Sequence, residues 1–431
     1  MKLSLGVSPG SGRRVWRSHD GLGLDFLKRQ FFVKPTGVTA TRTRNVLDLF
    51  TWSSSTKYVR NAAGVIAASG ANAPAFDHTI AGSPLGILIE KASTNLVLQS
   101  GDFSSASWAK VTGGAGVLPA ITHNDAVAPD GAVAADRIDL SIPAGSANTT
   151  DFSRVAQGPA TAAGQAYTGS LWIKAATLAD VGKVILFRHA GWSSYLAHVL
   201  TADWQRVSTT ETAAGSTADM QIGLRGGFGL PGGQSAVSAH VWGAQLELGS
   251  IPTSYIPTTT AAVTRNGDVI RRVLGAELDK SNLILAAEFS IDRASGSDGS
   301  FQQAIASIVD AAITGSDWAI LYTTTLARAS FRKNGATENF GQSGTLTHNG
   351  AISKQAIGFT NLATFGAVNG TTFLIDDTGT APSAPLTNLA TLQLGEFLTG
   401  ASNPAGRRIH LRALSLYPQT PDQARLNALT V

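Results

Sequence analysis

The sequence predicts an all-β protein in which two β-sandwich domains of the jelly-roll type follow one another along the chain. Charged residues make up only 14% of the 431 positions, and glycine accounts for 46 of them. This composition suits short strands joined by tight turns better than amphipathic helices. Segments of alternating apolar and polar residues recur between turn signals, as in sandwiches and barrels. The length fits two or three hydrophobic cores better than one.

The composition excludes several classes of protein. The chain has no cysteine, which excludes a disulfide framework, a thiolate nucleophile and a cysteine-ligated zinc site. It has no run of about 18 apolar residues, so we expect no membrane insertion. The apolar patch near the first residue is short and is broken by glycine and proline. We therefore expect no signal peptide and synthesis in the cytoplasm.

The N-terminal segment, residues 1–45, is basic and contains one expected strand, Leu22 to Phe26. Its first 44 residues include nine basic and two acidic side chains. A basic arm is either a solvated terminus or a segment that docks on an acidic partner. No stripe of aromatic and basic residues accompanies the charge, so we do not expect nucleic acid to be that partner. Residues 46–94 are expected to form a small β region that connects this segment to the first sandwich.

Residues 95–250 form the first predicted sandwich. On the expected strand 167–175, Gly169 and Leu171 share one face, and Ser170 and Trp172 share the other. A tryptophan on a polar face is either covered by a loop or offers its ring to the C–H face of a sugar. The other expected strands span residues 137–140, 184–189, 195–200, 205–212, 220–224 and 238–248.

The last of these strands is predicted to close the first sandwich. Its residues Trp242, Ala244, Leu246 and Leu248 alternate with others and fall on one face, which is the period of a half-buried strand. Two prolines and a run of threonines follow. Residues 251–275 are therefore expected to form an extended linker.

Residues 276–431 form the second predicted sandwich. A strand is expected from Leu283 to Ile291, where apolar residues alternate strictly. The pair Asn369-Gly370 predicts a hairpin turn. The series Thr420-Pro421-Asp422 offers an N-cap, a proline at the first helical position and an acid in the first turn. A short terminal helix is therefore expected at residues 421–429.

Catalytic signatures are almost absent, and we expect no enzymatic activity. The chain contains no Gly-x-Ser-x-Gly elbow, no Walker A loop and no His-Glu-x-x-His helix. Residues 227–232 match Gly-x-Gly-x-x-Gly, but Pro231 interrupts the motif and no helix follows to hold a pyrophosphate, so we interpret them as a glycine-rich loop. Asp376 and Asp377 are the most conspicuous acidic pair, but adjacent strand residues point to opposite faces and cannot act on one glycosidic bond.

The candidate ligand contacts are aromatic residues expected on exposed faces. They are Trp172, Trp192 and Tyr195 in the first sandwich and Trp318 and Tyr322 in the second. Aromatic rings pack well against sugars. For each of the five, packing inside the protein is the alternative interpretation.

No cofactor is expected apart from a possible structural calcium ion. Asp102, backbone carbonyl groups and Glu247 on the closing strand could together supply the hard oxygen ligands that calcium prefers.

Several segments in combination resemble virion structural proteins of tailed bacteriophages. Leu85–Leu96 looks like the entry to a domain of such proteins, and Ser100–Asp136 resembles the carbohydrate-binding-module-like jelly roll that follows it. Trp242–Thr258 is similar to the exit of that jelly roll. Leu392–Val431 resembles the end of a laminin-G or concanavalin A-like sandwich. The resemblance covers residues 47–431.

The resemblance implies a non-enzymatic tail fibre, spike or similar appendage. Residues 1–45 would then be a virion-attachment segment that binds other virion proteins, and the sandwiches would bind host cell-surface polysaccharide. Proteins of this kind are commonly homotrimers, and the protein would reside in the virion. Trp52 and Ala75 stand where relatives commonly have arginine, so contacts of those arginines are not expected here.

Two alternatives remain open. One is a polysaccharide depolymerase or lyase that acts on a sandwich face, which would release new reducing ends or unsaturated products. The other is a capsid decoration or head fibre protein, which the location on the particle would distinguish from a tail fibre.

Overall fold

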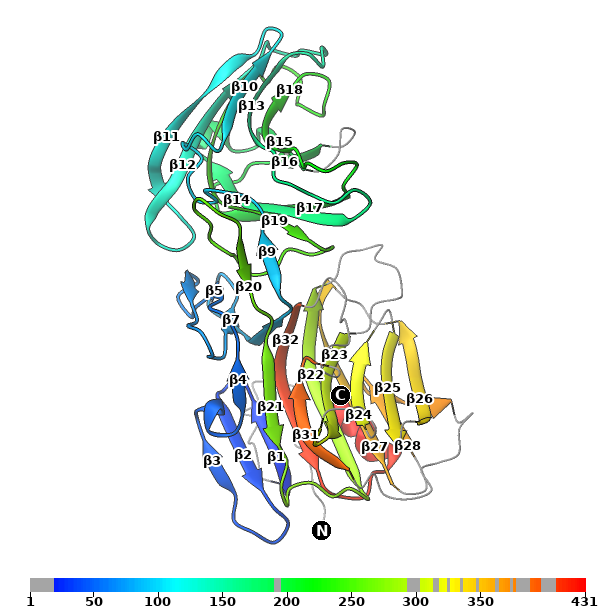
Figure 1. The fold of residues 1–431 in the computed structure, drawn as a ribbon. Coiled ribbons are helices and arrows are strands. Elements are labelled where there is room, and N and C mark those ends of the chain that lie inside the picture. The colour runs from blue at the N-terminus through cyan, green and yellow to red at the C-terminus, as the bar shows by residue number, and fades with distance from the viewer. Residues whose placement is uncertain are drawn as a thin grey trace.

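The computed structural model describes residues 19–189, 195–292, 303–312, 318–323, 326–333, 336–345, 349–360, 364–372, 375–376, 388–396 and 408–431. In these ranges the elements are strands, the short 3₁₀ helices Val46–Asp48 and Leu178–Asp180, and one α-helix, α1 (Gln423–Thr430). None of the described helices is long and apolar enough to span a membrane. The strands build two sandwiches that lie one above the other in Figure 1, which confirms the all-β prediction.

The first sandwich packs two five-stranded antiparallel sheets against each other. One sheet runs in the spatial order β10 (Ala109–Gly113), β13 (Phe152–Gln157), β18 (Met220–Arg225), β15 (Val184–Arg188) and β16 (Leu196–Val199). The other runs in the order β11 (Val117–Val127), β12 (Val133–Ser141), β19 (Ala236–Leu248), β14 (Ala166–Ala175) and β17 (Gln205–Thr212). Apolar side chains from both inner faces, among them Val155, Ile222 and Leu246, form one core.

A β-bulge at Gly243 changes the face presented by the closing strand β19. Gly243 has a φ of +66°, and the pairing with β14 shifts register at this point. Ala244 and Leu246 point into the core of the first sandwich, whereas Trp242 packs in a separate cluster. The prediction that Trp242 shares a face with Ala244 and Leu246 is therefore wrong, because the extra residue of a bulge inverts the alternation. Leu248, at the end of the strand, is 48% exposed.

The second sandwich packs a ten-stranded sheet against an eight-stranded sheet. The first runs in the order β29 (Thr371–Thr372), β28 (Thr364–Val368), β27 (Asn349–Phe359), β22 (Leu283–Asp292), β32 (Arg408–Tyr417), β1 (Gly21–Asp25), β2 (Gln30–Lys34) and β3 (Thr41–Thr43), with β8 (Pro84–Glu90) and β7 (Phe76–His78) attached through β32. The second runs in the order β30 (Ile375–Asp376), β26 (Ala336–Thr345), β25 (Leu326–Lys333), β24 (Trp318–Thr323), β23 (Gln303–Asp310), β31 (Leu389–Leu394), β21 (Val269–Val273) and β4 (Thr51–Ser53).

Strands from both ends of the chain meet in this sandwich. Leu22 and Leu24 of β1 pair with Leu416 and Leu414 of β32 and are fully buried in the common core. Strand β4 pairs with β21, and β8 pairs with β32. The predicted division, which set residues 1–45 and 46–94 apart from the second sandwich, therefore does not match the sheets. The N-terminal strands bury apolar residues that a free arm would leave exposed to water.

The predicted linker packs against the first sandwich instead of running through solvent. Ile256 and Thr258 are buried. The Ile256 amide donates to Gln245 Oε1 at 2.7 Å, and Thr258 Oγ1 donates to the Val97 carbonyl at 2.6 Å. Strand β20 (Val263–Arg265) then pairs with β9 (Ser93–Asn95), and β21 already belongs to the second sandwich. The small sheet of β5 (Tyr58–Arg60) and β6 (Ile66–Ala68) lies between the sandwiches in Figure 1.

The C-terminal features agree with the sequence except in one detail. Asn369 and Gly370 have φ values of +47° and +80° and join β28 to β29, which confirms the predicted hairpin turn. The helix α1 begins two residues later than predicted, because Asp422 and not Thr420 caps it, accepting a hydrogen bond from the Arg425 amide at 2.8 Å. Leu426 of α1 packs on the outer side of the ten-stranded sheet.

Candidate ligand-binding surface

The outer side of the sheet that contains β13, β18 and β15 carries an unusual set of side chains. Val155, Ile222 and Phe187 point inward and belong to the core. Neighbouring residues on the same strands must point outward, because strand side chains alternate. Phe152, Arg154, Tyr195, Gln221, Arg225 and Phe228 gather there, and we call them the arginine–aromatic surface.

Three aromatic rings of this surface are partly exposed and are in contact with guanidinium groups. The Arg154 guanidinium lies 4.5 Å from the centre of the Phe152 ring, and that of Arg225 lies 5.6 Å from the same ring. Tyr195 and Phe228 pack together with ring centres 4.8 Å apart, and Arg225 lies 5.5 Å from the Phe228 ring. Cation–π contacts of this kind fix the directions of both partners.

A hydrogen-bond network centred on Gln221 holds these groups in place. Gln221 is buried, and its Oε1 accepts from Arg154 Nη1 at 3.0 Å and from the Tyr195 hydroxyl at 3.1 Å. Arg225 Nη1 donates to the Tyr195 hydroxyl at 3.2 Å, and its Nε donates to the Thr149 carbonyl at 2.7 Å. The surface is therefore built on a rigid sheet and a buried amide, as a preformed binding site requires.

The positive charge of the surface is only partly neutralised. Asp219 pairs with the buried Arg188 and also accepts a hydrogen bond from the side-chain nitrogen of Gln221, Nε2. Neither Arg154 nor Arg225 has a carboxylate partner in the part of the chain that the structure describes. Both of these arginines are partly exposed. The surface thus combines aromatic rings, hydrogen-bonding groups and two cations without an acidic partner.

Of the two nominated aromatic residues whose side chains the structure describes, Tyr195 and Trp172, it places Tyr195 on this surface. Tyr195 takes part in the network described above. Trp192 lies outside the described residues. Trp318 and Tyr322 belong to β24, but their side chains lie outside the described part of the structure.

Trp172, the fifth nominated residue, is buried. Only 4% of its surface is exposed. It packs against Trp242 and Tyr255, with ring centres 5.3 and 5.7 Å away, and the Arg206 guanidinium lies 4.4 Å from its ring centre. Of the two interpretations of Trp172, the covered ring is the one found here, because the connector that carries Tyr255 packs on this side of β14.

A cleft of about 640 Å³ lies beside this aromatic cluster, between the small sheet, β17 and the connector. Three arginines, Arg60, Arg206 and Arg408, are among its lining residues. Arg206 is held by the Thr253 carbonyl at 2.7 Å and Ser170 Oγ at 3.0 Å, and burial lowers its pKa to about 10. Arg60 donates to the Gly64 carbonyl at 2.6 Å. Arg206 therefore ties β17 to the connector and to β14, and Arg60 ties β5 to the turn that follows it.

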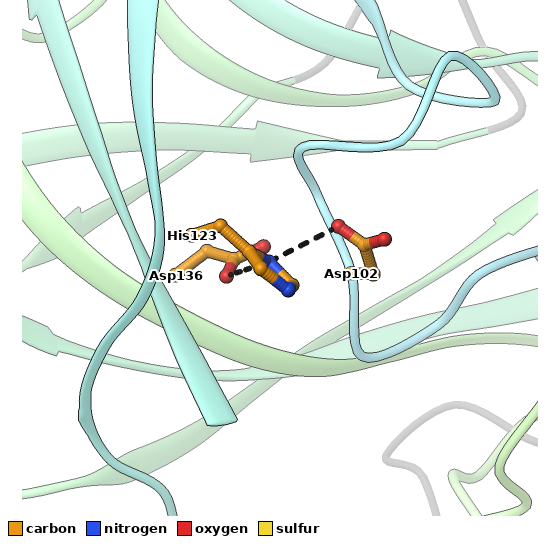
Figure 2. Close-up of side chains that lie close together, drawn as sticks. All are labelled: Asp102, His123 and Asp136. Carbon is orange, nitrogen blue, oxygen red and sulfur yellow. Dashed lines mark hydrogen bonds and ion pairs between the residues drawn. The ribbon is translucent and has the colours of Figure 1, made fainter. Parts of the chain in front are cut away.

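Asp102, His123 and Asp136 form a cluster of potential metal ligands (Figure 2). His123 Nδ1 lies 2.9 Å from Asp136 Oδ1 and 3.3 Å from Asp102 Oδ1. The buried Asp136 carboxylate also accepts from the amides of Phe103 at 2.7 Å and Asn124 at 2.8 Å. A His123 N–H shared between two carboxylates ties the loop of Asp102 to strands β11 and β12. These contacts account for the arrangement without an ion.

The predicted calcium pair of Asp102 and Glu247 does not form one site. Asp102 Oδ1 accepts from the Ser104 hydroxyl at 2.6 Å. The buried Glu247 carboxylate instead accepts from Ser93 Oγ at 2.6 Å, from Gln245 Nε2 at 2.5 Å and from the Thr253 amide at 2.9 Å. These donors, together with the Thr253 hydroxyl, occupy both carboxylate oxygens of Glu247, which is therefore a poor calcium ligand.

Of the six residues of the surface, Tyr195 was nominated from the sequence and the other five were missed. Gln221 lies in the expected strand 220–224, where it gave no signal by itself. Phe152 and Arg154 lie on β13, a strand that was not among those expected. Phe228 lies in the glycine-rich loop, whose aromatic residue was the available signal. Arg225, which lies just beyond the expected strand 220–224, gave no signal by itself, because its partner Phe152 is distant in the sequence.

No family model and no curated protein sequence matches the chain. Among solved structures, the CBM40 domain of the Ruminococcus gnavus IT-sialidase aligns with a TM-score of 0.27 at 15% identity, over 35% of this chain and 82% of that one. Domains LG4–5 of the mouse laminin α1 chain align with a TM-score of 0.21 at 11% identity, over 60% of this chain and 82% of the laminin chain. The CBM22 tandem of Paenibacillus barcinonensis Xyn10C aligns with a TM-score of 0.22 at 10% identity, over 80% of this chain and 98% of the Xyn10C chain. All three alignments are distant, and none of them shows a family for this chain.

Proposed function

We propose that this chain is a non-enzymatic glycan-binding protein and that the arginine–aromatic surface is its binding site. The observation that carries the proposal is the combination of partly exposed rings with a fixed hydroxyl and two guanidinium groups on one side of a sheet. Aromatic rings pack on the C–H faces of sugars, and polar side chains satisfy the sugar hydroxyls. The strands below supply the rigidity that such a site needs.

The same proposal places the protein in the virion of a tailed bacteriophage, as a tail fibre or spike-type appendage that binds host surface polysaccharide. The sequence resemblance over residues 47–431 supports this role. Strands β1 to β3 belong to the second sandwich, so attachment to other virion proteins through the N-terminal segment would involve the surface of that sandwich. A stable monomer that never associates with particles would count against the virion role. Immuno-electron microscopy of particles would separate a tail appendage from a capsid decoration or head fibre protein.

The binding site is tested with the full chain on an array of bacterial surface polysaccharides. We expect the wild-type protein to bind. We expect Phe228→Ala to weaken binding about tenfold or more, because the loss of stacking on an aromatic ring costs up to a few kcal/mol. Tyr58→Ala is the matched control, because Tyr58 lines the cleft and not this surface. Loss of binding in Tyr58→Ala alone would move the site to the cleft. Absence of binding to any glycan would overturn the proposal.

The non-enzymatic part of the proposal has its own test. Each polysaccharide that binds is incubated with the protein and analysed for new reducing ends and unsaturated products. We expect neither. Their appearance, abolished by substitution of a carboxylate or histidine in the sandwich, would establish a depolymerase or lyase instead.

A further inference from the structure

The two arginines without acidic partners bear on the chemical class of the glycan. Arg154 and Arg225 both contact the Phe152 ring, with their guanidinium groups 4.5 and 5.6 Å from its centre, so both cations border the same part of the surface. Asp219, the carboxylate beside the network, is occupied by Arg188 and Gln221. Asp151, next to Phe152 in the chain, is buried and accepts from the Ala115 amide at 2.8 Å and from Ser146 Oγ at 2.6 Å.

Both arginines keep donors that no described group satisfies. Arg154 donates through Nη1 to Gln221, and Arg225 donates through Nη1 and Nε to Tyr195 and Thr149. Within the described residues, no hydrogen bond involves the Nη2 group of either arginine. A guanidinium group presents its donors in a planar fork that matches a carboxylate.

We infer that the surface selects acidic polysaccharides, with a sugar carboxylate bound by Arg154 and Arg225 beside the aromatic rings. A neutral glycan would leave two partly desolvated cations without a counter-charge, whereas a uronic-acid type residue supplies one. The hydrogen bonds to Gln221 and Tyr195 hold the two guanidinium groups in position before the ligand arrives. This inference rests on the proposed glycan binding and names the ligand class of the same site.

The test compares each acidic polysaccharide that binds the full chain with its carboxyl-reduced form, which has the same backbone and no charge. We expect carboxyl reduction to weaken binding at least tenfold, because a charge-assisted hydrogen bond contributes more than a neutral one. We expect Arg154→Gln and Arg225→Gln to weaken binding of the acidic form by about tenfold each. Arg154→Lys should recover part of the loss, since it restores the charge without the fork.

The matched control is Arg137→Gln, which removes one positive charge from the other sheet, where Arg137 pairs with Asp139 at 2.9 Å. It should leave the affinity within about twofold of the wild type. Thermal melting of every variant shows whether it is folded. Binding in 50 and 300 mM salt should differ markedly for the wild type and less for Arg225→Gln, because salt screens exposed charges.

The outcomes separate this inference from the proposed function. Equal binding of the acidic and reduced forms that still depends on Phe228 would overturn the acidic class and keep the glycan site. Acidic binding that is unaffected by both arginine substitutions would also overturn the inference. Binding of no glycan at all would overturn the two together.

Discussion

Lys57 and Asp268 form an ion pair that is fully buried at the junction of the two sandwiches. Lys57 Nζ lies 2.6 and 2.8 Å from the two Asp268 carboxylate oxygens and donates to the Leu88 carbonyl at 2.6 Å. Asp268 Oδ2 also accepts from the Glu90 amide at 2.7 Å. The pair therefore joins the chain before β5, the end of β8 and the chain before β21.

Lys57→Met should destabilise the protein strongly, because it removes the cation that contacts both oxygens of the buried Asp268 carboxylate. Breaking a buried pair from one side costs about 3–5 kcal/mol. The double substitution Lys57→Met with Asp268→Asn should lose less stability, since neither charge of the pair remains. The side-chain oxygen of the new asparagine can still accept a hydrogen bond from the Glu90 backbone N–H. Chemical denaturation measures both. An equal loss in the single and double variants would show that burial of the charge is not the cause.

Stability should fall as the pH falls below about 6.5, through His189. Burial lowers the pKa of His189 to about 4, from an ordinary value of 6.5. The unfolded chain then binds a proton at a pH where the native chain does not, so acid favours unfolding. Between pH 7 and pH 5 this linkage removes about 2 kcal/mol.

The variant His189→Gln isolates this effect. Glutamine can still donate to the Thr209 carbonyl, which His189 contacts, but does not titrate. Its free energy of unfolding should depend less on pH between 7 and 5 than that of the wild type, whatever its value at pH 7. The same slope in both proteins would contradict the assignment.

Gly243→Ala should destabilise the first sandwich for two reasons. The φ of Gly243 is +66°, and an added Cβ would lie 2.9 Å from the Trp172 ring. Strained backbone and overpacking each cost about 1–3 kcal/mol. Gly182→Ala is the control, because its φ is +88° and nothing lies within 4 Å of the added atom. A loss in Gly243→Ala no larger than in Gly182→Ala would show that the contact with Trp172 does not matter.

Trp172→Phe should lower stability without changing glycan affinity. The indole ring fills the space between Trp242, Tyr255 and Arg206, so a smaller ring leaves a cavity that costs about 1–3 kcal/mol. It does not belong to the arginine–aromatic surface. Calorimetric binding at a temperature where the variant is fully folded checks the second part. A tenfold loss of affinity would return Trp172 to the binding site.

The sequence was most informative where hydrophobic alternation is uninterrupted. The strict alternation from Leu283 to Ile291 matches β22, whose residues Leu283, Leu285 and Phe289 lie in the core between the sheets. The opposite face of the strand, with Ile284, is apolar as well, because α1 packs there. A strand of this kind can be recognised from its own sequence, because burial on both faces requires apolar residues within the strand itself.

Features that depend on distant partners could not be predicted. The bulge at Gly243 turns Trp242 to the opposite face of β19. The position of the bulge depends on the pairing of β19 with β14, which the residues around Gly243 do not predict. The strand β1 joins the second sandwich through β32, almost 400 residues away along the chain. In the same way, the contacts of Phe152 with Arg225 exist only after β13 and β18 pair.

The most direct measurement of the central claim is hydrogen–deuterium exchange of the full chain with and without a saturating polysaccharide from the array. The account predicts slower exchange on binding in residues 195–199 and 220–228, which hold Tyr195, Gln221, Arg225 and Phe228. It predicts no change in residues 76–80 and 250–255, which border the cleft. Protection confined to the cleft or to the second sandwich would contradict the claim that the arginine–aromatic surface binds the glycan.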